Sequence, residues 1–211
     1  MDIGMLFSDS FDYAKEAVVG KWVKWILLII SAIIFPLLLG YELMVLRGEK
    51  PAPELGNWVK LFIDGLLYFI ISLIYSIPIF IVAMLTIGAG FFALAADPSS
   101  AVAGLGAMAI GLLLTIIVSI IISLIAAIAS VRFARTGKFG EAFNFGEIIG
   151  KIRSIGWVNY FIQILVMVIV IGVLVTILNM IPVIGQILYL ILIPVIAIFS
   201  ARYICLIYDS A

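Results

Sequence analysis

The sequence contains no histidine and only one cysteine in 211 residues. The absence of histidine removes the commonest general base and the commonest metal ligand. A single cysteine excludes an intramolecular disulfide and a cysteine-based metal cluster. Cys205 lies in an apolar stretch, so we expect its thiol to be buried and inert.

Motifs of known chemistry are also absent from the sequence. Residues 88–90 and 104–106 are glycine-rich, but their surroundings are apolar and lack the lysine of a phosphate-binding loop. No spacing typical of zinc ligands and no nucleophile elbow occurs, and no paired carboxylates stand at matched positions within the apolar stretches. We therefore predict that the protein is not an enzyme and that it has no catalytic residue, cofactor or metal.

Charge is scarce as well. Charged residues make up 11% of the chain and apolar residues 66%, against about 25% and 45–50% in soluble domains. The mean hydropathy is +1.37. A soluble protein of this length could not bury so much apolar surface, so the sequence predicts an all-α, polytopic integral membrane protein. The net charge of zero gives no indication of a nucleic-acid partner.

The charged residues that do occur are gathered into four clusters. They lie within residues 2–24, 42–64, 132–153 and 202–209, with Asp97 as the exception. All 12 cations lie in these clusters, so the positive-inside rule places the clusters on the cytoplasmic side of a cell membrane. The first apolar run follows a charged stretch and has no small-residue cleavage site after it, which argues against a cleavable signal peptide.

The order of apolar and polar stretches predicts a single membrane domain over residues 1–211. An apolar stretch of about 20 residues is long enough for one helical span. The polar stretches contain apolar residues at helical spacing, which indicates helices lying along the membrane surface. The predicted order is an interfacial helix at 1–22, a kinked or re-entrant segment at 25–46, an interfacial stretch at 47–65, spans at 66–95 and 104–131, an interfacial stretch at 132–156, and spans at 157–178 and 183–201.

Residues 25–46 allow two interpretations because Pro36 interrupts them. The segment could be one kinked span, or two half-helices of about ten residues that enter and leave on the same side. The charge rule favours the re-entrant hairpin, since a single crossing would leave Lys15, Lys21 and Lys24 outside. Both interpretations remain open from the sequence.

A weak internal repeat accompanies this layout. A basic residue and a glycine within residues 47–48 lead to a Glu-x-x-Asn pattern at 54–57. The same order recurs at 135–137 and 141–144. Each unit would consist of a surface amphipathic helix and a membrane hairpin, an arrangement found in transporters and in membrane proteins of other kinds.

The most regular pattern of small residues occupies the longest apolar tract. Seven small residues recur at every fourth position, which predicts a helix-packing seam because small residues let two membrane helices approach closely. The stripe could instead be a subunit contact or a polar pore lining, and its hydroxyls do not distinguish these, since each can bond to its own helix. The seam consists of Ala103, Ala107, Gly111, Thr115, Ser119, Ser123 and Ala127.

Other residues are assigned to the membrane boundary or to helix contacts. Aromatic rings and charges near span ends are typical of the headgroup level, whereas amides in the last hairpin are expected to join helices. Pro182 and Gly185 predict a tight membrane turn between the last two spans. The predicted interfacial anchors are Trp22, Trp25, Trp58 and Trp157, the interfacial charges are Glu42, Asp64, Arg132 and Arg135, and the amides are Asn159, Gln163, Asn179 and Gln186.

Short motifs spread along nearly the whole chain resemble those of a known family. They are Phe11-Asp12-Tyr13-Ala14, Lys21-Trp22, Gly40-Tyr41, Arg47, Trp58, Asp64-Gly65, Gly137, Glu141-Ala142-Phe143 and Ile181-Pro182-Val183-Ile184-Gly185. On these motifs the chain is similar to the archaeal and bacterial membrane family called domain of unknown function 4013. The resemblance implies an archaeal cell membrane as the home of the protein. It transfers no functional residue, because the family has no established activity.

Three hypotheses for the function follow from the sequence. The first is a non-enzymatic membrane scaffold that self-associates or binds another membrane protein, because surface helices on one side of a membrane suit that role. The alternative is a small transporter or channel, which the repeat and the hydroxyl stripe favour. The third, a lipid-modifying membrane enzyme, has no positive evidence. The predicted partners are membrane lipids, a second copy of the chain or another membrane protein.

Overall fold

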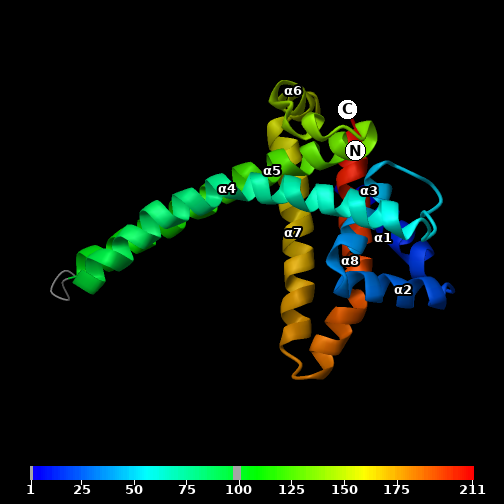
Figure 1. Ribbon diagram of the computed structural model, residues 1–211, viewed down its shortest axis with the longest axis horizontal. Helices are drawn as coiled ribbons and strands as arrows, with labels where there is room; N and C mark the ends of the chain where they lie inside the picture. Colours follow the sequence, from blue (N-terminus) through cyan, green and yellow to red (C-terminus); the bar gives the residue numbers. More distant parts are fainter. Residues whose placement is uncertain (1, 97–100) are drawn as a thin grey trace. The chain divides into compact units, whose positions relative to one another are not determined.

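The computed structural model describes residues 2–96 and 101–211, and its elements are shown in Figure 1. Within those residues all regular secondary structure is helical, with eight α-helices, one short 3-10 helix and no strand. Four of the α-helices are long and apolar enough to cross a membrane. The prediction of an all-α, multi-pass membrane protein is therefore confirmed. The four helices are α4 (Trp58–Ala96), α5 (Ala101–Thr136), α7 (Trp157–Asn179) and α8 (Ile184–Asp209).

The chain divides into two compact units. One contains the described residues up to Phe69 together with Ala127–Ala211, and the other contains Ile70–Ala126. Helices α4 and α5 contribute residues to both units. The loop expected around Asp97 lies outside the described residues. The single membrane domain stays a prediction.

Helix α8 is the centre of the first unit. Helices α1 (Ile3–Val18), α2 (Trp22–Ile33), α3 (Phe35–Leu46) and α7 all pack against it. It is the most buried of the four candidate spans for this reason, whereas most of α7 remains exposed. The 3-10 helix η2 (Phe139–Phe143) leads into α6 (Phe145–Ile155), which packs against α7 and α8.

Helix α1 is shorter than expected, and its buried face only partly matches the apolar residues whose spacing predicted it, which within α1 are Ile3, Phe7, Phe11, Ala14 and Val18. It ends at Val18, and the chain turns at Gly20, where φ is 77°, before α2 begins at Trp22. Phe11, on the face predicted from apolar spacing, is 62% exposed. The buried face also includes two polar residues, Ser10 and Tyr13. The buried residues are Leu6, Ser10, Tyr13, Ala14, Ala17 and Val18.

The segment that contains Pro36 forms two helices. Helices α2 and α3 have 12 residues each, a length of about 18 Å, which is less than the roughly 30 Å of a hydrocarbon core. The break falls at Ile34, and Pro36 lies in the first turn of α3. N–H groups in the first turn of a helix make no intrahelical hydrogen bond, so proline is tolerated there. Whether this pair crosses the membrane once or returns to the same side stays a prediction.

Helices α3 and α4 cross with their backbones in contact. A Cβ atom added at Gly40 would collide with the Leu61 carbonyl, and one added at Gly65 would collide with the Pro36 carbonyl. The obstructing atoms belong to the backbone and cannot rotate away, so glycine is required at both positions. Two of the family-like motifs therefore contain glycine because two helices meet there without side chains between them.

Each of the two internal interfacial stretches contains an asparagine that lies directly before the first residue of a helix. The Lys60 amide donates to Asn57 Oδ1 at 3.3 Å, and the Glu147 amide donates to Asn144 Oδ1 at 3.4 Å. Each bond satisfies one of the free N–H groups at a helix start. Asn57 has a φ of 47°, and α4 begins directly after it at Trp58. The helix therefore starts inside the predicted interfacial stretch and continues without a break into the predicted span. The internal repeat stays a prediction, and this shared capping pattern is consistent with it.

The second unit is an antiparallel pair formed by parts of α4 and α5. The two helices approach most closely at glycines. A Cβ atom added at Gly111 would lie 2.7 Å from Thr86 Oγ1, and one added at Gly90 would lie 2.7 Å from Met108 Cγ. A Cβ atom at Gly104 would lie 3.1 Å from the Gly90 carbonyl oxygen. Glycines therefore define the side of α5 that faces α4.

Candidate functional site

An apolar groove in the first unit is roofed by α1, and an ion pair between Asp9 and the buried Arg202 holds the roof to α8. Arg202 is only 3% exposed. Its Nε donates to Asp9 Oδ1 at 2.8 Å, and Lys50 Nζ donates to Asp9 Oδ2 at 3.0 Å. The Arg202 guanidinium also lies 4.9 Å from the ring centre of Tyr13, whose hydroxyl donates to the Glu49 carbonyl at 2.9 Å.

The charges around Asp9 determine its protonation. Burial alone raises the pKa of Asp9, but the hydrogen bonds and charges of Arg202 and Lys50 together bring that pKa below its ordinary value. The carboxylate is therefore ionised at neutral pH. An ionised Asp9 matters for the fold because a buried arginine left without its partner costs about 3–5 kcal/mol.

A second polar cluster lies where α2 meets the loop before α4. Lys21 Nζ and Lys24 Nζ each lie 3.3 Å from Glu54 Oε1. Lys24 is buried and lies 5.8 Å from the ring centre of Tyr41, whose hydroxyl donates to the Pro53 carbonyl at 2.9 Å. Burial raises the pKa of Glu54, yet the hydrogen bonds and charges of the two lysines lower it overall. This cluster ties the loop to the beginning of α2.

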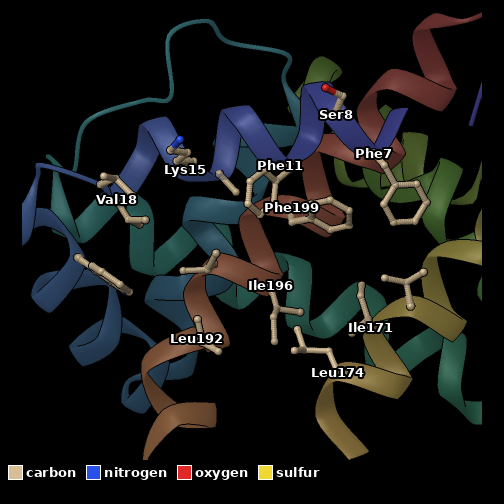
Figure 2. Close-up of a pocket in the computed structure, with 15 residues that line it drawn as sticks. Phe7, Ser8, Phe11, Lys15, Val18, Ile171, Leu174, Leu192, Ile196 and Phe199 are labelled. Carbon is tan, nitrogen blue, oxygen red and sulfur yellow. The ribbon is translucent and has the colours of Figure 1, made fainter. Parts of the chain in front are cut away.

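The groove itself has a volume of about 730 Å³. Figure 2 shows α1 running above it, with side chains of α7 and α8 converging from below. Ser8 and Lys15 are polar, and every other lining residue is apolar or aromatic. The main contributors are Phe7, Phe11, Ile171, Leu174, Leu192 and Ile196.

Aromatic side chains shape the two ends of the groove. At one end the Trp25 indole N–H donates to the Ile191 carbonyl at 3.1 Å. At the other end the rings of Phe7 and Phe199 pack with their centres 5.6 Å apart. The groove is therefore bounded by contacts between α1 or α2 and the central helix.

The small residues predicted to form a seam are spread between contact and exposed positions. Gly111 lies at the closest approach to α4. The hydroxyls of Thr115, Ser119 and Ser123 each donate to a carbonyl of their own helix, at 2.8–2.9 Å. Gly111 is buried, Thr115, Ser119 and Ala127 are partly exposed, and Ala103, Ala107 and Ser123 are exposed.

Helix geometry explains this spread. A step of four residues advances about 400° around an α-helix, so each member of the stripe lies about 40° beyond the one before it. Over the seven members the stripe passes around much of the helix surface. The glycines that touch α4, Gly104 and Gly111, are instead seven residues apart, a spacing that keeps them on one face.

The four predicted anchor tryptophans all reach the surface of the protein. Trp22 is exposed and stacks on Trp25, with ring centres 5.7 Å apart. Trp58 and Trp157 each begin a candidate span and are exposed. Rings at the start of a span are typical of the headgroup level. Their depth in a membrane stays a prediction.

Pro182 and Gly185 lie in a tight turn between α7 and α8. The Ile184 amide donates to the Pro182 carbonyl at 2.7 Å, and Val183 between them has a φ of 62°. A Cβ atom added at Gly185 would collide with the Leu178 carbonyl. The turn thus closes directly onto the last residues of α7, which only glycine permits.

Three of the predicted interfacial charges take part in ion pairs. Glu42, the fourth, is half-buried in α3. The pairs are partly exposed, so each contributes little to stability. The hydrogen bond from Arg132 is the main cause of a lowered pKa at Glu141. Arg47 pairs with Asp64 at 2.8 Å, Arg135 pairs with Asp209 at 2.7 Å, and Arg132 pairs with Glu141 and Glu147.

The predicted amides have different environments. Gln163 is buried, and its backbone carbonyl accepts a hydrogen bond from the Tyr203 hydroxyl at 3.1 Å, which joins α7 to α8. The Asn179 amide donates to a carbonyl of its own helix at 2.8 Å. Asn159 and Gln186 are exposed. Of the four amide residues, Gln163 is therefore the one whose hydrogen bond, from Tyr203 to its backbone carbonyl, joins two helices.

Sequence reasoning missed the residues that hold the roof of the groove. The last span was expected to end at residue 201, but α8 continues to Asp209 and carries Arg202 inside it. A cation inside an apolar helix needs a partner. The position of Arg202 in an apolar stretch was therefore the sequence signal that an acidic partner lies elsewhere in the chain. Its partner, Asp9, is separated from it by almost the entire chain, so sequence spacing could not identify the pair.

A family model described as a protein of unknown function, DUF4013, matches residues 25–183. The chain belongs to this family. The match confirms the resemblance carried by the motifs. Among the groove-forming helices, the DUF4013 match includes α7, whereas the whole of α1 and the whole of α8 lie outside the matched residues. No curated protein and no solved structure matches the chain.

Proposed function

We propose that this DUF4013 protein is a non-enzymatic membrane scaffold that associates with a second copy of the chain or with another membrane protein. The observation that carries the proposal is the hairpin of residues Ile70–Ala126. It forms a compact unit of its own, and small residues of α5 are open on the side that does not face α4. A hairpin of this kind offers a second helix a place to pack.

The open side of α5 has the spacing that membrane helices use to associate. Ala103 and Ala107, four residues apart, are both exposed. Two small residues four apart let a second helix approach closely enough for extensive van der Waals contact. Large apolar side chains alone would not favour association, because lipid tails solvate them equally well. The small residues are therefore the part of the surface that supports the proposal.

The test is the assembly state of the full chain in lipid. The protein is reconstituted in nanodiscs, and its mass and any stoichiometric partner are determined by native mass spectrometry. Disulfide crosslinking of Ala107→Cys in a Cys205→Ala background checks the contact for a second copy. A monomer without a stoichiometric partner and without crosslinking would contradict the proposal.

A matched pair of substitutions identifies the surface involved. We expect Ala107→Leu to reduce association, because the added side chain separates the two backbones. Ala109→Leu should leave association unchanged, since two residues correspond to about 200° around the helix. Equal effects of the two substitutions would show that the open side of α5 is not the contact.

A further inference from the structure

The groove beneath α1 opens among the inner residues of two candidate spans. Ile171 and Leu174 of α7 form one wall, and Leu192 and Ile196 of α8 form the other (Figure 2). Water would find few hydrogen-bond partners among these side chains, so an aqueous filling is unfavourable. The volume of about 730 Å³ lies within the range of roughly 300–1,000 Å³ for small-molecule sites. These properties suit a hydrocarbon chain.

The charges along α1 complement a lipid headgroup. Lys15 is the charged residue that lines the groove, and it is exposed. Within residues 2–96 and 101–211 no carboxylate forms an ion pair with it, whereas Lys21, Lys24 and Lys50 are all paired. Asp12 and Glu16 are exposed close to Lys15 on the same helix. The cation suits a phosphate, and the adjacent carboxylates suit an amine.

We propose that the groove binds one hydrocarbon chain of a zwitterionic phospholipid, with the lipid phosphate against Lys15. The chain would lie between α7 and α8 beneath Phe11, which is exposed on the groove side of α1. The ion pair between Asp9 and Arg202 keeps the roof in place. This site is independent of the scaffold proposal, because all its residues belong to the first unit and the association surface belongs to the second.

Photocrosslinking of the full chain in nanodiscs tests the hydrocarbon site. The probe is phosphatidylethanolamine with a diazirine in one acyl chain, and adducts are mapped by mass spectrometry. We expect adducts on the groove walls and a severalfold loss of them in Val195→Trp, which fills the groove. The control Leu190→Trp lies on the same helix but does not line the groove, so its adducts should match those of the wild type. Leu174→Trp, on the opposite wall, repeats the test if Val195→Trp fails to fold.

The headgroup contact needs a second probe, diacylglycerol with the same diazirine chain and no phosphate. Reversing the charge at Lys15 by Lys15→Glu should lower the ratio of phospholipid to diacylglycerol adducts at least about fivefold, the factor expected from roughly 1 kcal/mol per cation. Lys138→Glu, an exposed cation outside the groove, should leave the ratio unchanged.

Three results would overturn the proposal. The first is an even distribution of adducts around α7 and α8 that neither tryptophan substitution changes. The second is a phospholipid-to-diacylglycerol ratio that is the same in wild type and Lys15→Glu. The third is a protein crosslink that places a segment of a second copy in the groove.

Discussion

Glycine 111 provides the sharpest test of how the hairpin packs. A Cβ atom added there would lie 2.7 Å from Thr86 Oγ1 and 2.9 Å from the Ile87 amide nitrogen, whereas ordinary contact begins near 3.4 Å. The threonine side chain could rotate, but the amide nitrogen is backbone. Helices α4 and α5 would therefore have to separate by about half an ångström to admit alanine, and by more to admit leucine.

The magnitude follows from two opposing effects. Replacing a helix-interior glycine with alanine gains about 0.5–1 kcal/mol when nothing obstructs the new methyl group. Overpacking a tight contact costs about 1–3 kcal/mol. We expect Gly111→Ala to destabilise the protein by up to about 2 kcal/mol, because the cost of overpacking exceeds the gain from the alanine. We expect Gly111→Leu to destabilise the protein by about 1–3 kcal/mol.

Gly106 is the matched control on the same helix, since a Cβ atom added there meets nothing within 4 Å. Gly106→Ala should stabilise the protein by about 0.5–1 kcal/mol, and Gly106→Leu should not destabilise it. Unfolding of each full-length variant in detergent is followed by circular dichroism against temperature and against a denaturing detergent. Equal stability of Gly111→Leu and Gly106→Leu would refute the packing described for α4 and α5.

Three further predictions concern the first unit. Single cysteines in or next to the four polar clusters, in a Cys205→Ala background, should all react with an impermeant reagent from the cytoplasmic side. Suitable positions are Asp12, Glu49, Lys138 and Ser210. If the cysteine at Asp12 alone reacts from the opposite side, residues 25–46 cross the membrane once. The pKa of Asp9 is lowered in the folded protein, so its ionised form stabilises the fold above the unfolded pKa of about 3.9, and this stabilisation is lost as the pH falls through the lower folded pKa. Acid should therefore release α1 from α8, which the fluorescence of a label on α1 would report. An acid transition that is the same in Asp9→Asn as in the wild type would contradict this. Gly65→Ala should lower the melting temperature, because the added Cβ meets the Pro36 carbonyl. Gly172→Ala should raise the melting temperature slightly, because the space around Gly172 is open. A shift of the same sign in both variants would count against the crossing of α3 and α4.

The long helices were predictable from the sequence because composition alone forces them. Apolar runs of span length in a chain with few charges have no other stable conformation in a bilayer. The break near Pro36 and the turn at Pro182 and Gly185 were also visible, since proline and glycine act on the local backbone. The structure shows both features within two residues of the predicted positions.

Features that depend on a distant partner could not be predicted from local patterns. Asp9 and Tyr13 turn inward because Arg202, on another helix, binds them both. The apolar spacing of α1 therefore indicated a face that the structure leaves partly exposed. The start of α4 was misplaced for a more local reason, because Asn57 adopts a positive φ and caps the helix, and nothing in its neighbours requires that conformation.

Helices α4 and α5 are each longer than the hydrocarbon core of a bilayer is thick. Helix α4 has 39 residues, a length of about 58 Å, which is nearly twice the roughly 30 Å of a hydrocarbon core. The parts of α4 and α5 that belong to the second unit are each about 40 Å long, enough to cross with tilt. The charged residues of both helices, Lys60, Asp64, Arg132 and Arg135, all lie in the parts that belong to the first unit. We infer that, of α4 and α5, only the parts within Ile70–Ala126 lie in hydrocarbon. A span predicted from apolar length should therefore end where the first charged residue appears, even when the helix itself continues.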